Sequence, residues 1–389
     1  MRFFLLNNTW SSLIKFNNFF MNKFNFITQM EPWFSEEEKL AMNQYMEEGG
    51  WLTEFKRTAE FEQRIAEYTG AKHCVVVNNG TISLTLMAMA AGIKAGDEVI
   101  IPNYTMIATP NSVKMFGVTP IFVDVEPETL CMDIEKTEKA INSKTKAILF
   151  VNANGRNPKS GIESFVKLAN KYNLILLEDA AQSLGSKFPD GRHQGTVGLA
   201  GSFSFSAPKI ISTGQGGAII TNDDDMAFRL KRLKDFGRSG GGNDIHDSIG
   251  FNFKFTEMQA VIGNEQMKKL PWRVERKKEI YRQYKESLKF VNQIEFFDQD
   301  LEYTTPWFID ILVENRENLQ FWLKDKGIGT RIMYPPINKQ VAYNIPGDHS
   351  VSNLVGEKGL WLPSAAQLTN ENIEYICLKI KEYYQEHNN

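Results

Sequence analysis

Three short segments of the 389-residue sequence carry side chains that could take part in catalysis. The first is Asn78-Asn79-Gly80-Thr81, which follows the apolar residues 74–77 and precedes a helical pattern. Backbone N–H groups and the Thr81 hydroxyl at a helix N-terminus suit a phosphate, because the helix dipole favours negative charge there. The same residues also suit an ordinary helix-capping turn, so the segment alone does not identify a site.

The second segment ends an apolar strand pattern with the carboxylate of Asp179. An unpaired carboxylate is costly to bury, so we expect Asp179 to have a cationic partner. A protonated pyridine nitrogen of a cofactor would serve, because the ion pair would keep that nitrogen charged and able to draw electrons. A structural salt bridge to a lysine or arginine would satisfy the carboxylate as well.

The third segment places Lys209 after a strand-like stretch and before the glycine-rich residues 213–217. A lysine near an apolar wall loses proton affinity, and its neutral amine can form a Schiff base. Most lysines are solvated surface charges, so Lys209 gains significance only beside the other two segments. No GxxxxGK[ST] or GxGxxG pattern is present, which argues against a P-loop and a dinucleotide-binding fingerprint.

Each of the three segments lies at or just after the end of a predicted strand. Apolar runs alternate with helical patterns, which predicts an α/β fold with a mostly parallel sheet covered on both faces. The runs occupy residues 74–77, 98–101, 120–123, 147–151, 174–177, 202–205 and 218–221. Ligands of such sheets bind at the carboxyl ends of the strands, which is where the three segments fall.

After residue 270 the pattern changes to that of a smaller α+β unit. It contains a helical pattern from Trp272, strand-like residues 307–313 and 330–333, and a final helix over about 370–387. The sequence therefore predicts a large domain over 30–270 and a small C-terminal domain over 271–389. Residues 1–29 are expected to form an N-terminal extension with little structure, since residues 1–20 show no helical periodicity.

Composition narrows the choice of function. With 44 basic and 47 acidic residues the net charge is −3, which argues against a nucleic-acid partner. Three scattered cysteines without a CxxC pair favour a reducing, cytoplasmic location, and five histidines without metal-binding spacing argue against a metal site. The N-terminal residues contain no apolar run long enough for a signal peptide or a membrane span, so no membrane partner is expected.

The ordered motifs together resemble those of the DegT/DnrJ/EryC1/StrS sugar aminotransferases, which depend on pyridoxal 5'-phosphate (PLP) and have the aspartate-aminotransferase fold, PLP fold type I. The resemblance runs from about Met30 to the C-terminus. The motifs are Gly50-Trp51-Leu52-Thr53, Asn79-Gly80-Thr81, Glu178-Asp179-Ala180-Ala181-Gln182, Ser202-Phe203-Ser204-Phe205 with Lys209, Gly250-Phe251-Asn252-Phe253, Gly329-Thr330-Arg331 and Leu362-Pro363-Ser364.

This resemblance implies a role for each matching residue. Lys209 would form the Schiff base with PLP and move protons, while Asp179 would pair with the pyridinium nitrogen. Gln182 would contact the ring hydroxyl, and Met106 stands where the family usually has an aromatic residue that stacks on the ring. The residues implied for the cofactor phosphate are Gly80, Thr81, Ser204 and, from the second subunit of a homodimer, Asn252.

Substrate contacts are expected from five residues. Arg331 would bind the amino donor or the sugar nucleotide, and Thr53 lies in a family motif. His246 suits either a substrate contact or a solvated loop. The segment 152–156 departs from the HxYG of the family, and we expect Asn154 and Arg156 to tune binding of the nucleotide sugar; Arg156 could bind a diphosphate or lie in solvent.

The resemblance thus implies a PLP aminotransferase for glycan biosynthesis. The expected reaction converts a nucleotide-linked 4-keto-6-deoxyhexose into a 4-amino-4,6-dideoxy sugar nucleotide of the perosamine or viosamine type, with L-glutamate as donor. Alternatives are transfer at sugar C3 or to a cyclitol, and a non-catalytic PLP-binding regulatory protein. Dehydratases of the family have histidine in place of the lysine, so Lys209 argues against that activity.

Overall fold

The structure is a computed structural model that describes residues 26–240 and 244–387. Its larger sheet has seven strands in the order β1-β7-β6-β5-β4-β2-β3. The strands are β1 (His73–Val77), β2 (Glu98–Pro102), β3 (Thr119–Val123), β4 (Thr145–Val151), β5 (Ile175–Asp179), β6 (Ala200–Ser204) and β7 (Gly217–Thr221). Five neighbouring strands pair in parallel and only β7 runs opposite to the others, so the predicted mostly parallel sheet is confirmed.

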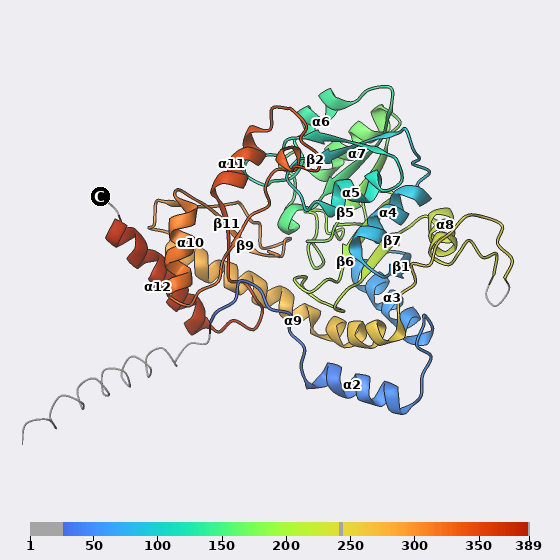
Figure 1. Cartoon of the computed structure of the whole chain (residues 1–389), viewed down its shortest axis with the longest axis horizontal. Coiled ribbons are helices and arrows are strands. Elements are labelled where there is room, and N and C mark those ends of the chain that lie inside the picture. Colours follow the sequence, from blue (N-terminus) through green and yellow to red (C-terminus); the bar gives the residue numbers. More distant parts are fainter. Residues whose placement is uncertain (1–25, 241–243, 388–389) are drawn as a thin grey trace, which may run out of the picture.

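Helices cover both faces of this sheet (Figure 1). On one face α4 (Gly80–Ala90), α5 (Ala108–Lys114) and α8 (Asp224–Lys234) bury the side chains of alternate strand residues such as Val75 and Val77. The intervening residues Cys74 and Val76 face α3 (Lys56–Thr69) and α9 (Glu257–Leu288), and α7 (Ile162–Lys171) lies farther along that face, with α6 (Ile134–Ala140) at its edge. Apolar residues on both faces of each strand are what a doubly covered sheet requires.

The antiparallel course of β7 positions Lys209. Because β7 returns beside β6, the loop between them lies at the carboxyl end of β6, which is also the carboxyl end of β5. The loop carries Lys209, and β5 ends at Asp179. Two residues 30 positions apart in the sequence therefore reach the same edge of the sheet.

A second, antiparallel sheet in the order β10-β11-β9-β8 forms the small domain. Its elements are β8 (Ile294–Phe296), β9 (Ile309–Val313), α10 (Arg316–Asp325), β10 (Arg331–Ile332), the short η2 (Ile337–Lys339), α11 (Ser350–Lys358), β11 (Gly359–Leu362) and α12 (Asn370–His387). The final helix lies where the sequence predicted it. The short strands β8 and β11 and helix α11 were not predicted.

The predicted domain limits differ from the structure in two places. Helix α9 is continuous over 32 residues and has Pro271 inside it, so the expected boundary at 270/271 falls within a helix that runs from one sheet to the other (Figure 1). At the N-terminus, Ile27 is buried in the core of the small domain and pairs with Ile328, so residues 26–29 are structured. Residues 1–25 of the expected extension lie outside the described residues.

The chain continues from Ile27 into α2 (Glu36–Glu47), which packs on α9. The predicted capping box is present, because Ser35 and Glu38 satisfy the first turn of this helix. Within the described part of the chain, no helix combines the length and apolar character that a membrane span needs. The same part contains no cluster of three or more histidine, cysteine or acidic side chains that could hold a metal ion.

Candidate active site

A cavity of about 510 Å³ opens at the carboxyl edge of the large sheet, where the small domain meets it. Strand ends, helix N-termini and small-domain residues contribute to its wall. Eight of the residues predicted for the site line it: Gly80, Thr81, Met106, Asp179, Gln182, Ser204, Lys209 and Arg331. The three motifs at strand ends therefore share one cavity.

The N-terminus of α4 forms one end of the cavity. Asn79 caps the helix, since its side chain accepts a hydrogen bond from the Ile82 N–H at 2.9 Å. Gly80 lies so close to Ser204 that a Cβ at Gly80 would be 2.7 Å from the Ser204 Cβ. The glycine thus allows the helix N-terminus and the Ser204 hydroxyl to meet, and together with Thr81 they offer donors to an anion.

Asp179 lies at the base of the cavity and is only 5% exposed. The Thr109 hydroxyl donates to one carboxylate oxygen at 2.7 Å and the Ala181 N–H to the other at 3.2 Å. Among the described residues, no lysine or arginine lies within salt-bridge distance of this carboxylate. Burial raises its pKa, which the two hydrogen bonds and Lys209 oppose. The structural salt bridge is therefore not formed, and the carboxylate suits a cationic ligand.

The amine of Lys209 is buried in the same cavity. Burial lowers its pKa to about 8, Asp179 raises it and Arg331 lowers it further. The Nζ atom lies 4.2 Å from the ring centroid of Trp307, so the apolar wall that the sequence suggested includes a small-domain indole. At pH 7 a lysine with this pKa is neutral in about a tenth of molecules, far more than a solvated lysine, and the neutral form is the nucleophile.

Met106 and Gln182, the residues that the resemblance assigns to the cofactor ring, both line the cavity. Met106 is 43% exposed, and its sulfur accepts from the Ala108 N–H at 3.0 Å. The side-chain oxygen of Gln182 accepts from the Asn154 N–H at 2.7 Å. Thr109, Trp307 and Tyr334 also line the cavity but were not predicted, because no local pattern distinguishes them from core residues.

Asn154 and Arg156 are placed differently from the expectation. Both are buried and neither lines the cavity. The Asn154 amide donates to Phe308 O and to Asp310 at 3.0 Å each and accepts from Phe308 N–H at 2.7 Å. Arg156 forms an ion pair with Asp310, and its guanidinium lies 5.0 Å from the Phe297 ring. Neither alternative for Arg156, a diphosphate contact or solvent, corresponds to this geometry.

Thr53, His246 and Asn252 lie on the surface of this chain and do not line the cavity. Thr53 accepts a hydrogen bond from the Trp51 indole, and the His246 Nδ1 lies 2.9 Å from Phe236 O. Asn252 pairs with Asp235 in an isolated bridge. A single chain thus brings eight of the predicted residues together and leaves these three outside.

Comparison with known proteins agrees with this site. The family model described as the DegT/DnrJ/EryC1/StrS aminotransferase family matches residues 34–381, so the chain belongs to that family. A GDP-perosamine synthase of Escherichia coli O157:H7 is 35% identical over 93% of this chain and 99% of the relative. A dTDP-3-amino-3,6-dideoxy-alpha-D-galactopyranose transaminase of Aneurinibacillus thermoaerophilus is 33% identical over 92% of this chain and 98% of the relative.

A protein of Streptococcus pneumoniae described as a sugar aminotransferase and solved in its PLP form has the same fold. Its TM-score is 0.86 at 25% identity, and the alignment covers 93% of this chain and 99% of that one. The chain is therefore an aminotransferase, and its cofactor is PLP. The residues of the cavity fit that cofactor: donors for a phosphate at α4, an uncompensated carboxylate for the pyridinium, and a buried amine at Lys209.

Proposed function

We propose that this enzyme transfers the amino group of L-glutamate to the keto carbon of a nucleotide-linked 4-keto-6-deoxyhexose. The product is a 4-amino-4,6-dideoxy sugar nucleotide of the perosamine or viosamine type, for glycan biosynthesis. The observation that carries the proposal is the similarity to GDP-perosamine synthase over nearly the whole of both chains. The buried free cysteines, Cys74, Cys131 and Cys377, suit the cytoplasmic location that we include in the proposal.

When bound, PLP supplies an electron-withdrawing ring that labilises the bonds at the carbon bearing the amino group. Asp179 holds the charge on the ring nitrogen. Lys209 would hold the cofactor through Nζ, and within each half-reaction its freed, neutral amine would move a proton between the substrate carbon and the cofactor carbon. Gly80, Thr81 and Ser204 bind the phosphate, while Met106 and Gln182 orient the ring.

Arg331 is the residue that we assign to the acidic substrates. It lines the cavity from β10 of the small domain, and its guanidinium stacks over Trp361 at 5.5 Å. A guanidinium can bind a carboxylate or a phosphate through two parallel hydrogen bonds. The glutamate carboxylate and the diphosphate of the nucleotide sugar both meet that requirement, and the two substrates use the site in turn.

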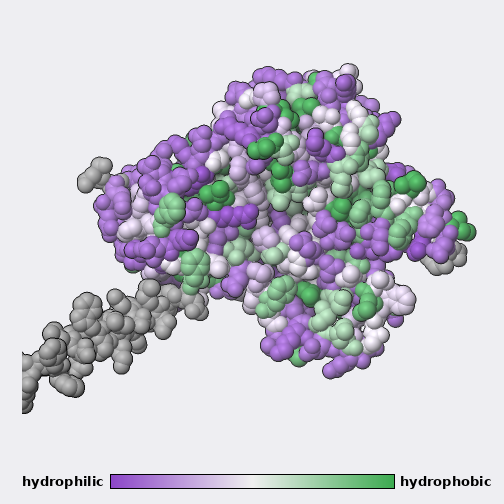
Figure 2. All heavy atoms as spheres, viewed as in Figure 1, coloured by the Kyte–Doolittle hydropathy of each residue, from purple (hydrophilic) through white to green (hydrophobic). Residues whose placement is uncertain are grey.

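A homodimer is part of the proposal, because Asn252 lies outside the cavity of its own chain. The surface near Asn252 exposes several apolar side chains: Trp51, Leu52, Phe55, Ile249 and Phe251. Figure 2 shows hydrophobic surface in this part of the molecule, near α2 and α8. In the homodimer, Asn252 of one subunit would reach the cofactor phosphate in the cavity of the other subunit. Thr53 and His246 would approach the substrate bound in that same cavity.

Complementation tests this shared site. Lys209→Ala and Asn252→Ala homodimers each lack one component, but a mixed dimer has one site with both. Random re-association of the two inactive proteins should restore about a quarter of wild-type turnover, since half of the dimers are mixed and each has one intact site. If native mass spectrometry shows mixed dimers but no turnover is recovered, Asn252 does not complete the active site of the partner subunit.

The substrate is tested with a panel of UDP-, GDP- and dTDP-linked 4-keto-6-deoxyhexoses, each with glutamate, followed by mass analysis of the products. We expect an amino sugar from a 4-ketosugar and none with Lys209→Ala. A second candidate is transfer at C3, which the similarity to a 3-amino sugar transaminase favours. The 3-ketosugars belong in the same panel, and amination of these alone would replace the proposed substrate.

A further inference from the structure

The carbonyl groups of Pro208 and Ile210, the residues before and after Lys209, are each bound by a distant side chain. The indole N–H of Trp307 donates to Pro208 O at 2.8 Å, and Nη1 of Arg273 donates to Ile210 O at 2.8 Å. Trp307 comes from the small domain, just before β9, and Arg273 from helix α9. The backbone that carries the amine is therefore held on both sides by elements outside its own loop.

Arg273 is an unusual choice for a structural donor, because it is only 3% exposed and, among the described residues, has no carboxylate at salt-bridge distance. Its guanidinium also donates to Gln266 at 2.7 Å and to Trp33 O at 3.0 Å, and it lies 5.2 Å from the Trp33 ring. Burial lowers its pKa to about 10, although Glu38 raises it. An apolar side chain would avoid this desolvation, so the guanidinium at this position points to a need for its hydrogen bonds.

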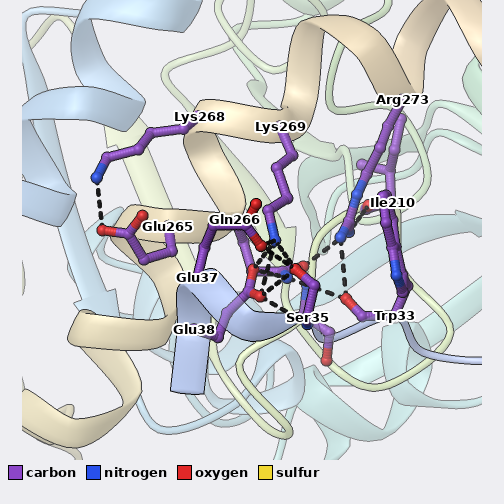
Figure 3. Close-up of polar contacts among 11 residues, drawn as sticks. Trp33, Ser35, Glu37, Glu38, Ile210, Glu265, Gln266, Lys268, Lys269 and Arg273 are labelled. Carbon is purple, nitrogen blue, oxygen red and sulfur yellow. Dashed lines mark hydrogen bonds and ion pairs between the residues drawn. The ribbon is translucent and has the colours of Figure 1, made fainter. Parts of the chain in front are cut away.

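A second α9 residue extends the same contact. Gln266 is fully buried, and its side-chain oxygen accepts both from Arg273 and from the Ser212 N–H, at 3.3 Å. Its amide donates to Glu38 at 2.6 Å, and Glu38 in turn pairs with Lys269 at 2.8 Å (Figure 3). The N-terminal segment that contains Trp33 and Glu38 thus forms one polar network with α9 behind the Lys209 loop.

The contact on the other side depends on the small domain. The Trp307 ring lies over Lys209 Nζ and stacks on Phe308 at 3.8 Å. Phe308 is fixed in turn by both hydrogen bonds of the Asn154 amide to its backbone. The small domain therefore helps to fix the carbonyl group of Pro208, through the indole N–H of Trp307.

We propose that Arg273 and Trp307 are positioning residues, which fix the carbonyl groups of Ile210 and Pro208 on either side of Lys209 so that its amine reaches both the cofactor and the substrate carbon. The inference rests on the proposed function, in which Lys209 does both. A lysine side chain has four rotatable bonds, so the accuracy of its Nζ depends on a fixed Cα. Loss of either hydrogen bond should slow proton transfer more than it weakens binding.

The variants separate the hydrogen bonds from packing. Trp307→Phe keeps a ring beside Lys209 but removes the indole N–H. Arg273→Met removes all side-chain donors, whereas Arg273→Lys keeps a charged donor group. Arg276→Met is the matched control, because Arg276 lies one turn along α9 and contacts Glu279, Leu368 and Asn370 rather than the loop.

Three readouts apply to each variant. The holoenzyme gives the rate constant and KM of the glutamate half-reaction and, from its absorbance, the pKa of the covalent linkage to PLP. The apoprotein gives the rate at which PLP attaches covalently. We expect Trp307→Phe and Arg273→Met to slow the half-reaction by about tenfold to a hundredfold with little change in KM. Both should shift the pKa of the linkage, Arg273→Lys should recover part of the rate, and Arg276→Met should match wild type.

Wild-type rate constants and an unchanged linkage pKa in Trp307→Phe and Arg273→Met would overturn the inference, as would a change confined to KM. If Arg273→Met does not fold, Arg273→Lys and Trp307→Phe decide the question by the same readouts. A separate experiment tests the role that the proposed function gives to Lys209. If Lys209 does not bond to PLP, borohydride reduction of wild-type holoenzyme will leave no cofactor on the Lys209 peptide. A labelled Lys209 with unaffected variants removes this inference alone.

Discussion

Arg156 and Asp310 form an ion pair in which both side chains are only 2% exposed. Arg156 follows η1 (Ala153–Gly155) at the end of β4, and Asp310 belongs to β9. The pair therefore joins the two domains, and Asn154 adds a hydrogen bond to the same carboxylate. A segment in which the sequence suggested substrate contacts instead fixes the small domain against the large one.

Asp310→Asn should destabilise the protein by about 3–5 kcal/mol, because it leaves the Arg156 guanidinium buried without a counter-charge. The free energy of unfolding from urea denaturation measures this loss. Asp325→Asn is a matched control, since its exposed pair with Lys326 should contribute less than about 1 kcal/mol. Equal stabilities of the two variants would mean that the buried pair does not hold the domains together.

Replacement of Asp179 should affect activity and stability in opposite directions. Burial raises the pKa of this carboxyl group, so the folded apoprotein binds the proton more tightly than the unfolded chain. The free energy of unfolding should therefore fall as the pH rises through the folded-state pKa, because the buried carboxyl group then becomes charged. Asp179→Asn should give an apoprotein at least as stable as wild type at pH 7, measured by thermal unfolding.

The same variant should react at least about tenfold more slowly, which corresponds to ~1.4 kcal/mol on the barrier. Without the carboxylate, no acidic side chain remains among the described residues that line the cavity, so none can hold the charge on the ring nitrogen. The glutamate half-reaction, followed by the absorbance of the cofactor, provides the measurement, and Asp190→Asn is an exposed control. A smaller effect would contradict the role assigned to Asp179.

The pKa of Lys209 predicts a pH dependence for cofactor attachment. Only the neutral amine attacks the PLP aldehyde, and burial lowers the pKa of Lys209 to about 8. The attachment rate should therefore rise with pH through about 8 and level off above it, as stopped-flow absorbance can measure. A midpoint near the ordinary lysine value would show that the amine is solvated in the apoprotein. Lys209→Ala should show no attachment at any pH.

The N-terminal segment should contribute to the stability of the small domain. Ile27 is buried against the core that contains Ile328, whereas its neighbour Phe26 is 54% exposed. Ile27→Ala should lower the free energy of unfolding by about 2–5 kcal/mol, and Phe26→Ala by much less. A comparison of urea midpoints for the two variants tests this. Similar midpoints would indicate that residues 26–29 do not pack in solution.

The residues that the sequence analysis brought together were those with a local signal. Gly80, Asp179 and Lys209 each follow an apolar strand, and a parallel sheet places such residues at one edge. The capping box of Ser35 and Glu38 and the final helix α12 are also local patterns, and both are present. The fold class and the core of the candidate site were predictable for this reason.

Other features depend on partners far along the chain. Arg156 pairs with a residue 154 positions away, and no pattern near Arg156 distinguishes a buried ion pair from a ligand contact. The start of α9 was missed because Pro271 normally interrupts a helix, whereas the capping box of Thr256 and Gln259 begins this one much earlier. Strand β8 has only three residues, too few to show an alternating pattern.

The unbroken course of α9 restricts which changes of length the protein can tolerate. Its first half packs on α2 and α3, and its second half carries Ile280, Tyr284 and Leu288 into the small-domain core. One residue inserted or deleted near Pro271 would rotate one half against the other by about 100° and shift it by about 1.5 Å along the axis. Trp307 and Arg331 would turn away from the cavity as a result. Substitutions in the middle of α9 can be absorbed, whereas a change in its length would alter the relative orientation of the two sheets.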